Sequence, residues 1–268
     1  MEIGLIGLGK MGKGLALNMM RNGYKLTVQN RSSGPADEIA AKGAKKAGSI
    51  AELVGMLKPR RIVWLMLTAG EPTESAIKEL SGLLSKGDIV IDGSNSQFTD
   101  SVRMHGLLGE RGISLIDAGC SGGPSGALNG LCIMAGGDPE AVKHVEQLLK
   151  DLSIENGYLY TGKIGSGHFI KMVHNAIEYG MMQSIAEGLE LIEEGPYSGA
   201  DLAAICDLWD NGSVIRGYLI ELAARSFKKD RHLSEIEPYV DDMGEGRWSV
   251  QTAVDYAVPF TTISNSLF

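Results

Sequence analysis

The first 160 residues alternate short apolar runs with segments of helical periodicity. Short apolar runs bounded by turn residues are typical of buried strands, and strands that alternate with helices form parallel sheets. The pattern therefore predicts a doubly wound α/β domain. The expected strands are 1–5, 25–29, 61–67, 88–92, 114–118, 131–135 and 158–161. The expected helices are 11–21, 36–42, a helix that Ser49 caps and that ends at Leu57, 74–84, 100–111 and 138–149.

The alternation stops after Gly162, and the rest of the chain has only helical patterns. A long helix begins near Gly165 and meets no strong breaker before Gly195. Further helices are expected at 201–209, at 214–227 and from Val250 onward. We therefore expect two domains, a sheet domain over 1–163 and an all-helical domain over 164–268.

The long helix carries an ionisable stripe on an otherwise apolar surface. At 3.6 residues per turn its polar residues lie at i, i+3, i+4 and i+7, on one face. A helix apolar on most sides is buried, so the stripe is expected to face a cavity. An exposed ion pair between Lys171 and Glu178 is the alternative. The stripe consists of Lys171, His174, Asn175 and Glu178, with Tyr179 and Met182 beside it, and the apolar residues are Phe169, Ile170, Met172, Val173, Ala176 and Ile177.

Composition narrows the class of protein. The chain has 268 residues and a net charge of -8, which argues against nucleic acid and an anionic membrane surface as partners. No apolar run is long enough to cross a membrane, and the N-terminus lacks the features of a signal peptide. A cytoplasmic protein with a small-molecule substrate is therefore expected.

Cysteine and histidine do not indicate a metal site. The three cysteines show no CxxC spacing and are expected to be buried thiols in a reducing cytosol. The five histidines have no spacing typical of metal ligands; His168 and His174 would point to different sides of a helix. We expect no metal.

The turn after the first strand reads Gly7-Leu8-Gly9-Lys10-Met11-Gly12 and opens a helix. In a strand–GxGxxG–helix unit the first glycine makes the turn, the second admits the pyrophosphate and the third lets helix and strand pack closely. The negative charge then lies at the helix N-terminus. The first domain is thus predicted to be a Rossmann-type dinucleotide-binding domain.

The end of the second strand favours NADP over NAD. An acidic residue near this position would bind the ribose 2′-hydroxyl in an NAD-selective domain, but the chain reads Asn30-Arg31-Ser32. A guanidinium with a nearby hydroxyl suits a 2′-phosphate. NAD stays open as a cofactor, because the alternative interpretation of Arg31 is a solvated loop charge.

Five strand ends are glycine-rich or polar and should meet at one edge of the sheet, where ligands bind in such folds. One of them, residues 119–124, could present backbone N–H groups to an anion or could be a flexible turn. The five ends are 7–12, 30–32, 67–70, 93–96 and 119–123.

The helix stripe suits a two-stage reaction on a hydroxy acid. Oxidation of a hydroxyl by a nicotinamide needs a general base, and Lys171 can serve when it is neutral. Oxidation β to a carboxylate gives a β-keto acid, which loses CO₂ to form an enol. Glu178 can exchange a second proton, and a lysine ammonium can polarise the carbonyl without a metal.

These residues carry a family resemblance along the whole chain. It resembles the decarboxylating 6-phosphogluconate dehydrogenases, in their shorter form. The wider β-hydroxyacid dehydrogenases share the spacing of Gly167, Lys171 and Asn175 but as a rule lack the adjacent His174 and Glu178-Tyr179-Gly180. The motifs that carry the resemblance are GLGKMG at 7–12, NRS at 30–32, DGSNSQF at 92–98, GCSGGPSGA at 119–127 and GHFIKMVHNAIEYGMMQ at 167–183.

The resemblance implies oxidation of 6-phosphogluconate to ribulose 5-phosphate and CO₂ with reduction of NADP⁺ or NAD⁺. It implies that Lys171 is the base and later acid at the sugar hydroxyl, and that Glu178 protonates the enediol. It also implies a homodimer or homotetramer. The implied substrate residues are Asn95, Ser121, Gly122, Gly123, His174, Asn175 and Tyr179, and the implied cofactor residues are Gly7, Leu8, Gly9, Lys10, Met11, Gly12, Asn30, Arg31, Ser32, Ala69 and Asn95.

Three departures from the family pattern concern the substrate phosphate and the cofactor loop. Met243 stands where longer members have a phosphate-binding lysine, four residues before the basic residue of Gly246-Arg247-Trp248. Thr68 replaces the lysine of a VKAG loop. The family's phosphate-binding arginine would lie two residues beyond Phe268, so we expect a truncated C-terminus.

Two other functions remain open at this point. Because residues that would bind a substrate phosphate are missing, the sequence also fits a β-hydroxyacid dehydrogenase that acts on an unphosphorylated acid such as 3-hydroxyisobutyrate. The glycine-rich turn, taken by itself, also fits a protein that binds NADP without catalysing a reaction.

Overall fold

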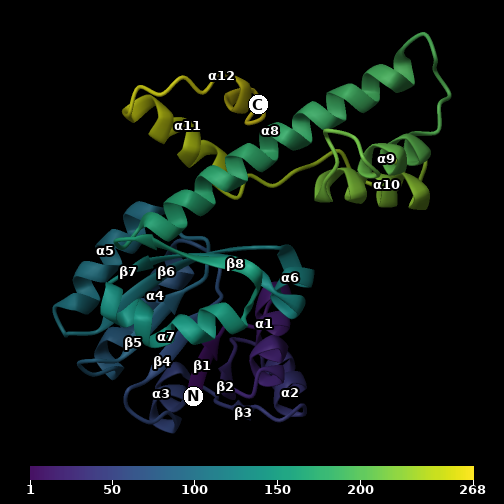
Figure 1. Cartoon of the computed structure of the whole chain (residues 1–268). Helices are drawn as coiled ribbons and strands as arrows, with labels where there is room; N and C mark the ends of the chain where they lie inside the picture. Colours follow the sequence, from purple (N-terminus) through teal and green to yellow (C-terminus); the bar gives the residue numbers. More distant parts are fainter. The chain divides into compact units, whose positions relative to one another are not determined.

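An eight-stranded sheet forms the centre of the first part of the chain (Figure 1). The computed structural model describes all 268 residues, which divide into two units, Met1–Met172 and Val173–Phe268. The strands follow the order β3-β2-β1-β4-β5-β6-β7-β8. They are β1 (Glu2–Ile6), β2 (Lys25–Gln29), β3 (Lys45–Lys46), β4 (Ile62–Leu65), β5 (Ile89–Asp92), β6 (Ser114–Ser121), β7 (Leu131–Gly137) and β8 (Ser153–Gly162).

The sheet confirms the α/β class and corrects the expectation that it is wholly parallel. Strands β6 and β7 pair antiparallel, and all other neighbours are parallel. The short connection over 122–130 explains this, because a return to a parallel strand needs a crossover of a dozen or more residues. The two-lysine strand β3 was not expected, and β8 is longer than the predicted 158–161.

Helices cover both faces of the sheet in the first unit (Figure 1). One hydrophobic cluster joins α1, α2, α6 and α7 to the sheet, and a second joins α3, α4 and α5 to the other face. The predicted helices are confirmed with shifted ends, and α6 was not predicted. They are α1 (Lys10–Arg21), α2 (Ser33–Ala40), α3 (Ile50–Met56), α4 (Glu71–Leu83), α5 (Phe98–Gly109), α6 (Gly123–Asn129) and α7 (Pro139–Asp151).

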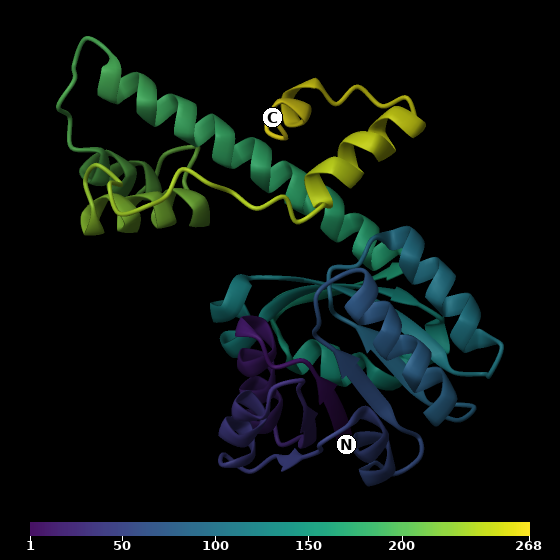
Figure 2. The same ribbon diagram turned by 180° about the vertical axis from the view of Figure 1, so that it is seen from behind.

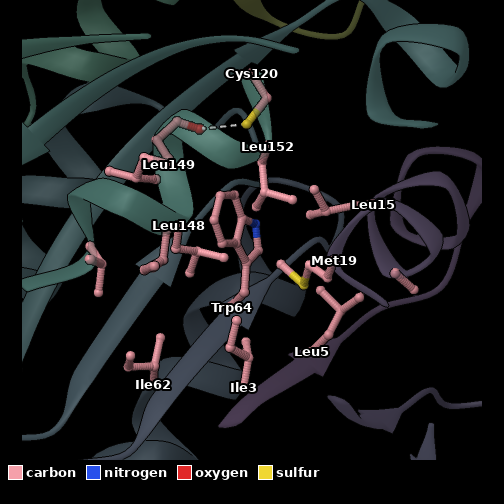
Figure 3. Packing of buried hydrophobic residues seen from close by; sticks show 14 of the residues in the cluster. Ile3, Leu5, Leu15, Met19, Ile62, Trp64, Cys120, Leu148, Leu149 and Leu152 are labelled. Atoms are coloured by element: carbon pink, nitrogen blue, oxygen red, sulfur yellow. Dashed lines mark hydrogen bonds between the residues drawn. The ribbon is translucent and has the colours of Figure 1, made fainter. Parts of the chain in front are cut away.

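Trp64 of β4 lies at the centre of one of these layers (Figure 3). It is fully buried, as expected for a central strand covered on both faces. Gly93 of the neighbouring strand end leaves room for the indole, because a Cβ there would lie 2.6 Å from Trp64 Nε1. Around the indole lie Leu15 and Met19 of α1, Leu148 and Leu149 of α7, and Leu152.

The predicted long helix is confirmed as α8 (Ser166–Glu194), and its first turn lies directly on β6 and β7. A Cβ at Gly167 would lie 2.4 Å from Met134 O and 2.5 Å from Asp117 O. A Cβ at Gly119 would lie 2.4 Å from Lys171 Cβ. Glycine at both contact points therefore lets the helix backbone approach the strands more closely than any other residue would.

The expectation that α8 is buried on most of its apolar sides is wrong for this chain. Ile177 and Met181 are 48% and 51% exposed, whereas Lys171 and Asn175 are each only 6% exposed. The glycine contacts explain part of this reversal, because they bring the side of the helix that carries Lys171 onto the sheet. The buried Lys171 also rules out the alternative of an exposed ion pair with Glu178.

Four shorter helices complete the second unit (Figure 2). The C-terminal half of α8 packs against the two that follow it through Leu189, Leu202, Cys206, Ile220 and Ala224. The third begins at Glu245, earlier than the expected Val250. No helix of the chain is long and apolar enough to cross a membrane. The four are α9 (Leu202–Asp210), α10 (Tyr218–Lys229), α11 (Glu245–Asp255) and α12 (Thr261–Asn265).

We predict that Gly167→Ala destabilises the protein by about 3 kcal/mol, because its methyl group would overlap two backbone oxygens that cannot move independently. Gly106→Ala in α5 is the control, since nothing lies within 4 Å of a Cβ there, and it should be neutral or stabilising by up to about 1 kcal/mol. Urea unfolding of both variants measures the difference. Equal unfolding midpoints would contradict the close docking of α8.

Candidate active site

The polar strand ends predicted from the sequence lie at one edge of the sheet. Strands β2, β1, β4, β5 and β6 are neighbours in that order and run parallel. Their carboxyl ends therefore share an edge, where open α/β sheets bind ligands. Each end contributes a different feature to this edge.

The β1–α1 turn has the geometry that a pyrophosphate needs. A Cβ at Gly7, where φ is 97°, would lie 2.2 Å from Met66 O, and one at Gly12 would lie 2.1 Å from Gly7 O. Nothing lies within 4 Å of a Cβ at Gly9, which is the N-cap of α1 and offers no side chain to the first-turn N–H groups. An uncapped, open helix N-terminus fits an anionic group.

Asn30 joins the ends of β1 and β2. Its Oδ1 accepts a hydrogen bond from Leu8 N at 2.9 Å, and its Nδ2 donates to Ser32 O and Oγ at 3.0 Å. Arg31 is exposed between these contacts, and Lys10 is exposed on the neighbouring turn. The arrangement keeps the Arg31 backbone beside the glycine-rich turn.

Ala69 lies in the loop between β4 and α4. The following Gly70 has φ 84° and is the N-cap of α4, again without a side-chain cap. Thr68, which replaces a lysine of the family pattern, uses its carbonyl oxygen to accept a hydrogen bond from Thr73 Oγ1 at 2.7 Å.

Asp92, which the sequence analysis did not single out, shapes the loop that holds Asn95. Its buried carboxylate accepts from Ser94 N at 3.0 Å and from Ser96 Oγ at 2.8 Å. Between these two contacts Asn95 adopts a φ of 56°, a conformation that asparagine tolerates better than most residues. Ser94 Oγ also accepts from Leu67 N at 3.1 Å, which ties the β4 and β5 ends together.

The segment after β6 is helical rather than a flexible turn. Gly122 has φ 121° and is the N-cap of α6, Gly123 has φ 59°, and Ser121 ends the strand half-buried. A Cβ at Gly122 would lie 3.1 Å from Gly126 Cα. The two glycines are therefore required by the sharp turn from strand to helix, which begins without a side-chain cap.

Lys171 lies against β6 with only a small exposed fraction. Its aliphatic stem packs over Gly119, and its charge acts on the neighbouring Cys120 thiol. Burial raises the pKa of Cys120 to about 12, with the Lys171 charge opposing the rise and Asp92 adding to it. Cys120 is thus an inert buried thiol, like Cys206, whereas Cys132 is exposed and corrects the expectation that all three are buried.

Asp117 holds the N-terminus of α8 and was not recognised from the sequence. Its fully buried carboxylate accepts from Gly165 N through Oδ1 at 2.8 Å and from His168 N through Oδ2 at 2.7 Å. The His168 ring is also buried, with Nδ1 2.7 Å from Ser101 Oγ. These contacts fix the turn of α8 that precedes Lys171.

The second unit gathers the other polar residues of the α8 stripe. Asn175 Nδ2 donates to Glu245 Oε1 at 3.1 Å, and Asn175 Oδ1 lies 3.0 Å from His174 Nδ1. His174 Nδ1 is 3.8 Å from Glu178 Oε2, and both of these side chains are partly exposed. Glu245 is 7% exposed and is a further residue that the sequence analysis did not identify.

Tyr179 packs on the N-terminal turn of α11. A Cβ at Gly246 would be 3.5 Å from its ring, so glycine lets the ring lie against the helix backbone. Burial raises the pKa of Tyr179 to about 12, and the charges of Glu245, Glu178 and Asp242 together with a hydrogen bond to Glu245 add to the rise. The Tyr179 hydroxyl therefore keeps its proton at neutral pH.

Arg247 is not in a position to replace the missing lysine without rearrangement. Its guanidinium is exposed and donates to Asp242 Oδ2 through Nε at 3.1 Å and Nη2 at 2.7 Å. Met243, which occupies the lysine position, is exposed. No group of three or more His, Cys, Asp or Glu side chains in the chain could hold a metal ion.

Two family models cover the chain. Residues 2–162 match the NAD binding domain of 6-phosphogluconate dehydrogenase, and residues 167–268 match the C-terminal domain of 6-phosphogluconate dehydrogenase. The chain belongs to the 6-phosphogluconate dehydrogenase family. By this membership it is an NAD(P)-dependent oxidoreductase, and the resemblance seen in its motifs is confirmed.

Relatives differ in length and in the cofactor they are named for. YqeC of Bacillus subtilis, which is provisionally named a 6-phosphogluconate dehydrogenase, is 42% identical over all of this chain and 89% of its own. The NAD⁺-dependent decarboxylating 6-phosphogluconate dehydrogenase of Haloferax volcanii is 35% identical over 100% and 89%. The NADP⁺-dependent enzyme of Bacillus subtilis is 40% identical, but the chain covers only 60% of it.

Solved structures show the same fold. The 6-phosphogluconate dehydrogenase of Plasmodium falciparum superimposes with a TM-score of 0.90 at 31% identity, over all of this chain and 61% of that one. The 3-hydroxyisobutyrate dehydrogenase of Mycobacterium tuberculosis gives a TM-score of 0.80 at 21% identity, over 99% and 90%. At that identity the second likeness indicates the fold alone.

We predict that Asp117→Asn weakens the N-terminus of α8 by about 2 kcal/mol. An amide keeps only one of the two acceptor oxygens, so either Gly165 N or His168 N loses its partner while buried. Asp138→Asn is the control, because Asp138 is an ordinary N-cap of α7 and asparagine caps as well as aspartate.

Hydrogen exchange of the peptide over 165–172, together with urea unfolding, measures the effect. Exchange should accelerate in Asp117→Asn and stay unchanged in Asp138→Asn. Unchanged exchange in both variants would show that the α8 N-terminus does not depend on the Asp117 carboxylate.

Proposed function

We propose that this protein oxidises and decarboxylates 6-phosphogluconate to ribulose 5-phosphate and CO₂, with NADP⁺ or NAD⁺ as the oxidant. The observation that carries the proposal is the α8 stripe in a chain of this family. Lys171 and Glu178 are seven residues apart on one continuous helix, so about two helical turns separate them on the same side. One helix therefore carries both proton-transfer groups. Lys171 is the base for the substrate hydroxyl, and Glu178 is the acid for the carbon that loses CO₂.

In the first stage we propose that Lys171, as a neutral amine, accepts the proton of the substrate hydroxyl β to the carboxylate. The hydrogen on the same carbon leaves as hydride, and the bound nicotinamide supplies the acceptor. The products are a β-keto acid and a Lys171 ammonium. Packing over Gly119 shields Lys171 from water and holds its stem, which favours a defined position for its amine.

In the second stage the bond to the carboxyl carbon breaks, and its electron pair forms the enolate. The Lys171 ammonium returns its proton to the former carbonyl oxygen, which gives an enediol and CO₂. Glu178 then donates a proton to the carbon, while Lys171 takes the enol proton as the ketone forms. Lys171 thus ends the cycle with one extra proton and Glu178 with one fewer, so transfer of a proton from Lys171 to Glu178, directly or through water, restores the starting state, and no metal ion is required.

For the cofactor, we infer that the open α1 N-terminus at Gly9 receives the pyrophosphate. Asn30 and Ser32 hold the loop in which Arg31 would contact a 2′-phosphate. Named relatives include both NAD⁺- and NADP⁺-dependent enzymes, so they do not decide which cofactor this chain uses. The choice between NADP and NAD therefore depends on Arg31. We propose NADP.

A second candidate function rests on the phosphate end of the substrate. Met243 provides no charge, and Arg247 is already paired with Asp242. An unphosphorylated β-hydroxy acid such as 3-hydroxyisobutyrate would need neither residue. This reaction would use Lys171 as the base but would release no CO₂.

We also propose that a second copy of the chain covers the apolar side of α8. Ile177, Met181 and Met182 are large and about half exposed. Such a row of apolar side chains on one helix is typical of a surface that another subunit covers. A homodimer or homotetramer follows, and its size can be measured by light scattering.

Assay with 6-phosphogluconate tests the proposed reaction. We predict equal amounts of reduced cofactor and trapped CO₂. Lys171→Met and Glu178→Gln should each lower turnover by roughly a hundredfold or more, as expected for a lost proton-transfer group. Lys163→Met and Glu187→Gln, which change exposed residues of the same type, should leave turnover unchanged.

Two other outcomes would overturn the proposal. Oxidation of 3-hydroxyisobutyrate without activity on 6-phosphogluconate would favour the second candidate. Cofactor binding without turnover of either substrate, and without any effect of Lys171→Met, would indicate a non-catalytic protein.

Cofactor choice is tested by binding rather than by activity. We predict that Arg31→Ala weakens NADPH binding about tenfold to a hundredfold and leaves NADH binding within about twofold, because only NADPH carries the 2′-phosphate. Arg111→Ala, an exposed arginine at the opposite edge of the sheet, is the control. Cofactor fluorescence measures both affinities, and equal losses for NADPH and NADH would contradict the role of Arg31.

A further inference from the structure

A cavity of about 370 Å³ opens at the edge of the sheet opposite to the candidate active site. It lies where β1, β2 and β3 begin, next to the ends of α1 and α3, at the bottom of the first unit in Figure 1. Ligand pockets in proteins have volumes of about 300–1,000 Å³, so this cavity has room for a small metabolite. None of the residues assigned above to substrate or cofactor lines it.

The cavity lies beside the part of β2 that β3 does not cover. Strand β3 pairs with β2 only from Thr27 onward, so Lys25 and Leu26 have no strand next to them on that side. The chain reaches β3 through Lys42 and Gly43, and both of these residues line the cavity. The sheet is therefore open here, at the start of an inner strand.

Three lysines line the cavity, and two of them share one face of the sheet. Lys45 is the register partner of Thr27, and Lys25 precedes Thr27 by two residues, so these side chains lie on the same face. Neither Lys25 nor Lys45 forms an ion pair within the chain. Glu2 is the only acidic residue of the lining, which therefore has a net charge of +2 in a chain whose net charge is -8.

Structural roles explain the three lysines only in part. Lys42 follows the last turn of α2 and lies 3.8 Å from Glu38 Oε1, as expected for a cation near a helix C-terminus. Lysine on an edge strand discourages pairing with another chain, which accounts for Lys45 and Lys46 of β3 alike. Lys25 lies on an inner strand, and neither of these roles applies to it.

Thr27 supplies the second observation that points to a ligand. It is only 4% exposed, and it lines the cavity. Its hydroxyl makes no hydrogen bond within the chain, whereas most polar side-chain atoms at such depth have a partner. The side chain lies on the face that also carries Lys25 and Lys45. An occupant with charged oxygen atoms gives the hydroxyl a partner and gives the two lysines a countercharge.

We propose that this cavity binds a small organic anion with at least two negative charges, of the phosphate or carboxylate type, through Lys25, Lys45 and the Thr27 hydroxyl. Ionised oxygen acceptors form strong hydrogen bonds with ammonium and hydroxyl donors. Met20 and Met56 also line the cavity and offer apolar contacts to the carbon frame of such an anion. The inference goes beyond the proposed function and does not rest on it.

The cavity and the cofactor site lie at opposite ends of the same strand. Strand β1 begins at this edge with Glu2 and ends at Ile6, directly before the glycine-rich turn. Its five residues span roughly 17 Å at the usual rise of a strand. A dinucleotide bound at the turn therefore leaves the cavity free, and the two ligands bind without competition.

Isothermal titration calorimetry of the full chain in the presence of saturating NADPH tests the site. The two probes are methylenediphosphonate, which has two phosphonate groups, and citrate, which has three carboxylates. We expect one probe molecule per chain, and the tighter probe identifies the class of anion. Lys25→Met and Lys45→Met change exposed residues and should each weaken binding about tenfold. Lys46→Met, on the same strand but outside the cavity, is the control and should stay within about twofold.

Thr27→Val distinguishes a ligand contact from a structural one. Because the hydroxyl has no partner within the chain, valine should leave the midpoint of urea unfolding unchanged or raise it. The same variant should bind the probe about threefold to tenfold more weakly, since one hydrogen bond to the anion is lost. A lower midpoint would show that the hydroxyl has a structural partner and would remove the observation on which the proposal depends.

Three further results would overturn the proposal. The first is the absence of saturable binding of either probe. The second is equal weakening by Lys46→Met and Lys25→Met, which would indicate general attraction to surface charge. The third is loss of probe binding in Lys171→Met, which would place the probe at the candidate active site instead.

Discussion

The buried carboxylate of Asp117 is the contact on which the candidate site depends. It lies on a central strand and accepts hydrogen bonds from two backbone N–H groups at the start of α8. A helix N-terminus placed against a sheet would otherwise leave buried donors without partners, which is costly. Glycines at 119 and 167 then allow the helix backbone to approach the strands. Lys171, one turn further along, is held over β6 as a result.

A second buried carboxylate organises the other part of α8. Glu245 Oε1 accepts a hydrogen bond from Asn175 Nδ2, and Asn175 Oδ1 in turn lies 3.0 Å from His174 Nδ1. In both cases an acid with no proposed part in proton transfer contacts residues for which we propose a part in substrate binding or proton transfer. This division of roles is physically reasonable, because a buried carboxylate that accepts hydrogen bonds holds its partners in place, whereas the reacting groups must be able to gain and lose protons.

The local sequence predicts the elements well and their long-range contacts poorly. Apolar runs located seven of the eight strands, and the spacing of Lys171 to Glu178 located the helix stripe. Strand β3 was missed because its Lys45–Lys46 pair has no apolar residue and joins the sheet through its backbone. Asp117 and Glu245 were missed because their partners lie 48 to 70 residues away, beyond any local pattern. The exposed apolar side of α8 was likewise not predictable, since contacts distant in the sequence, the close approach at Gly119 and Gly167 among them, decide which side of the helix meets the sheet.

In the proposed reaction one helix carries both proton-transfer groups, with Lys171 acting during oxidation and Glu178 acting after loss of CO₂. A single-turnover experiment on Glu178→Gln separates the two stages. We predict that 6-phosphogluconate reduces one equivalent of cofactor and releases CO₂ at close to the wild-type rate in this variant, while ribulose 5-phosphate forms slowly. Cofactor reduction that slows as much as ketose formation would contradict it, because Glu178 would then act already in the oxidation step.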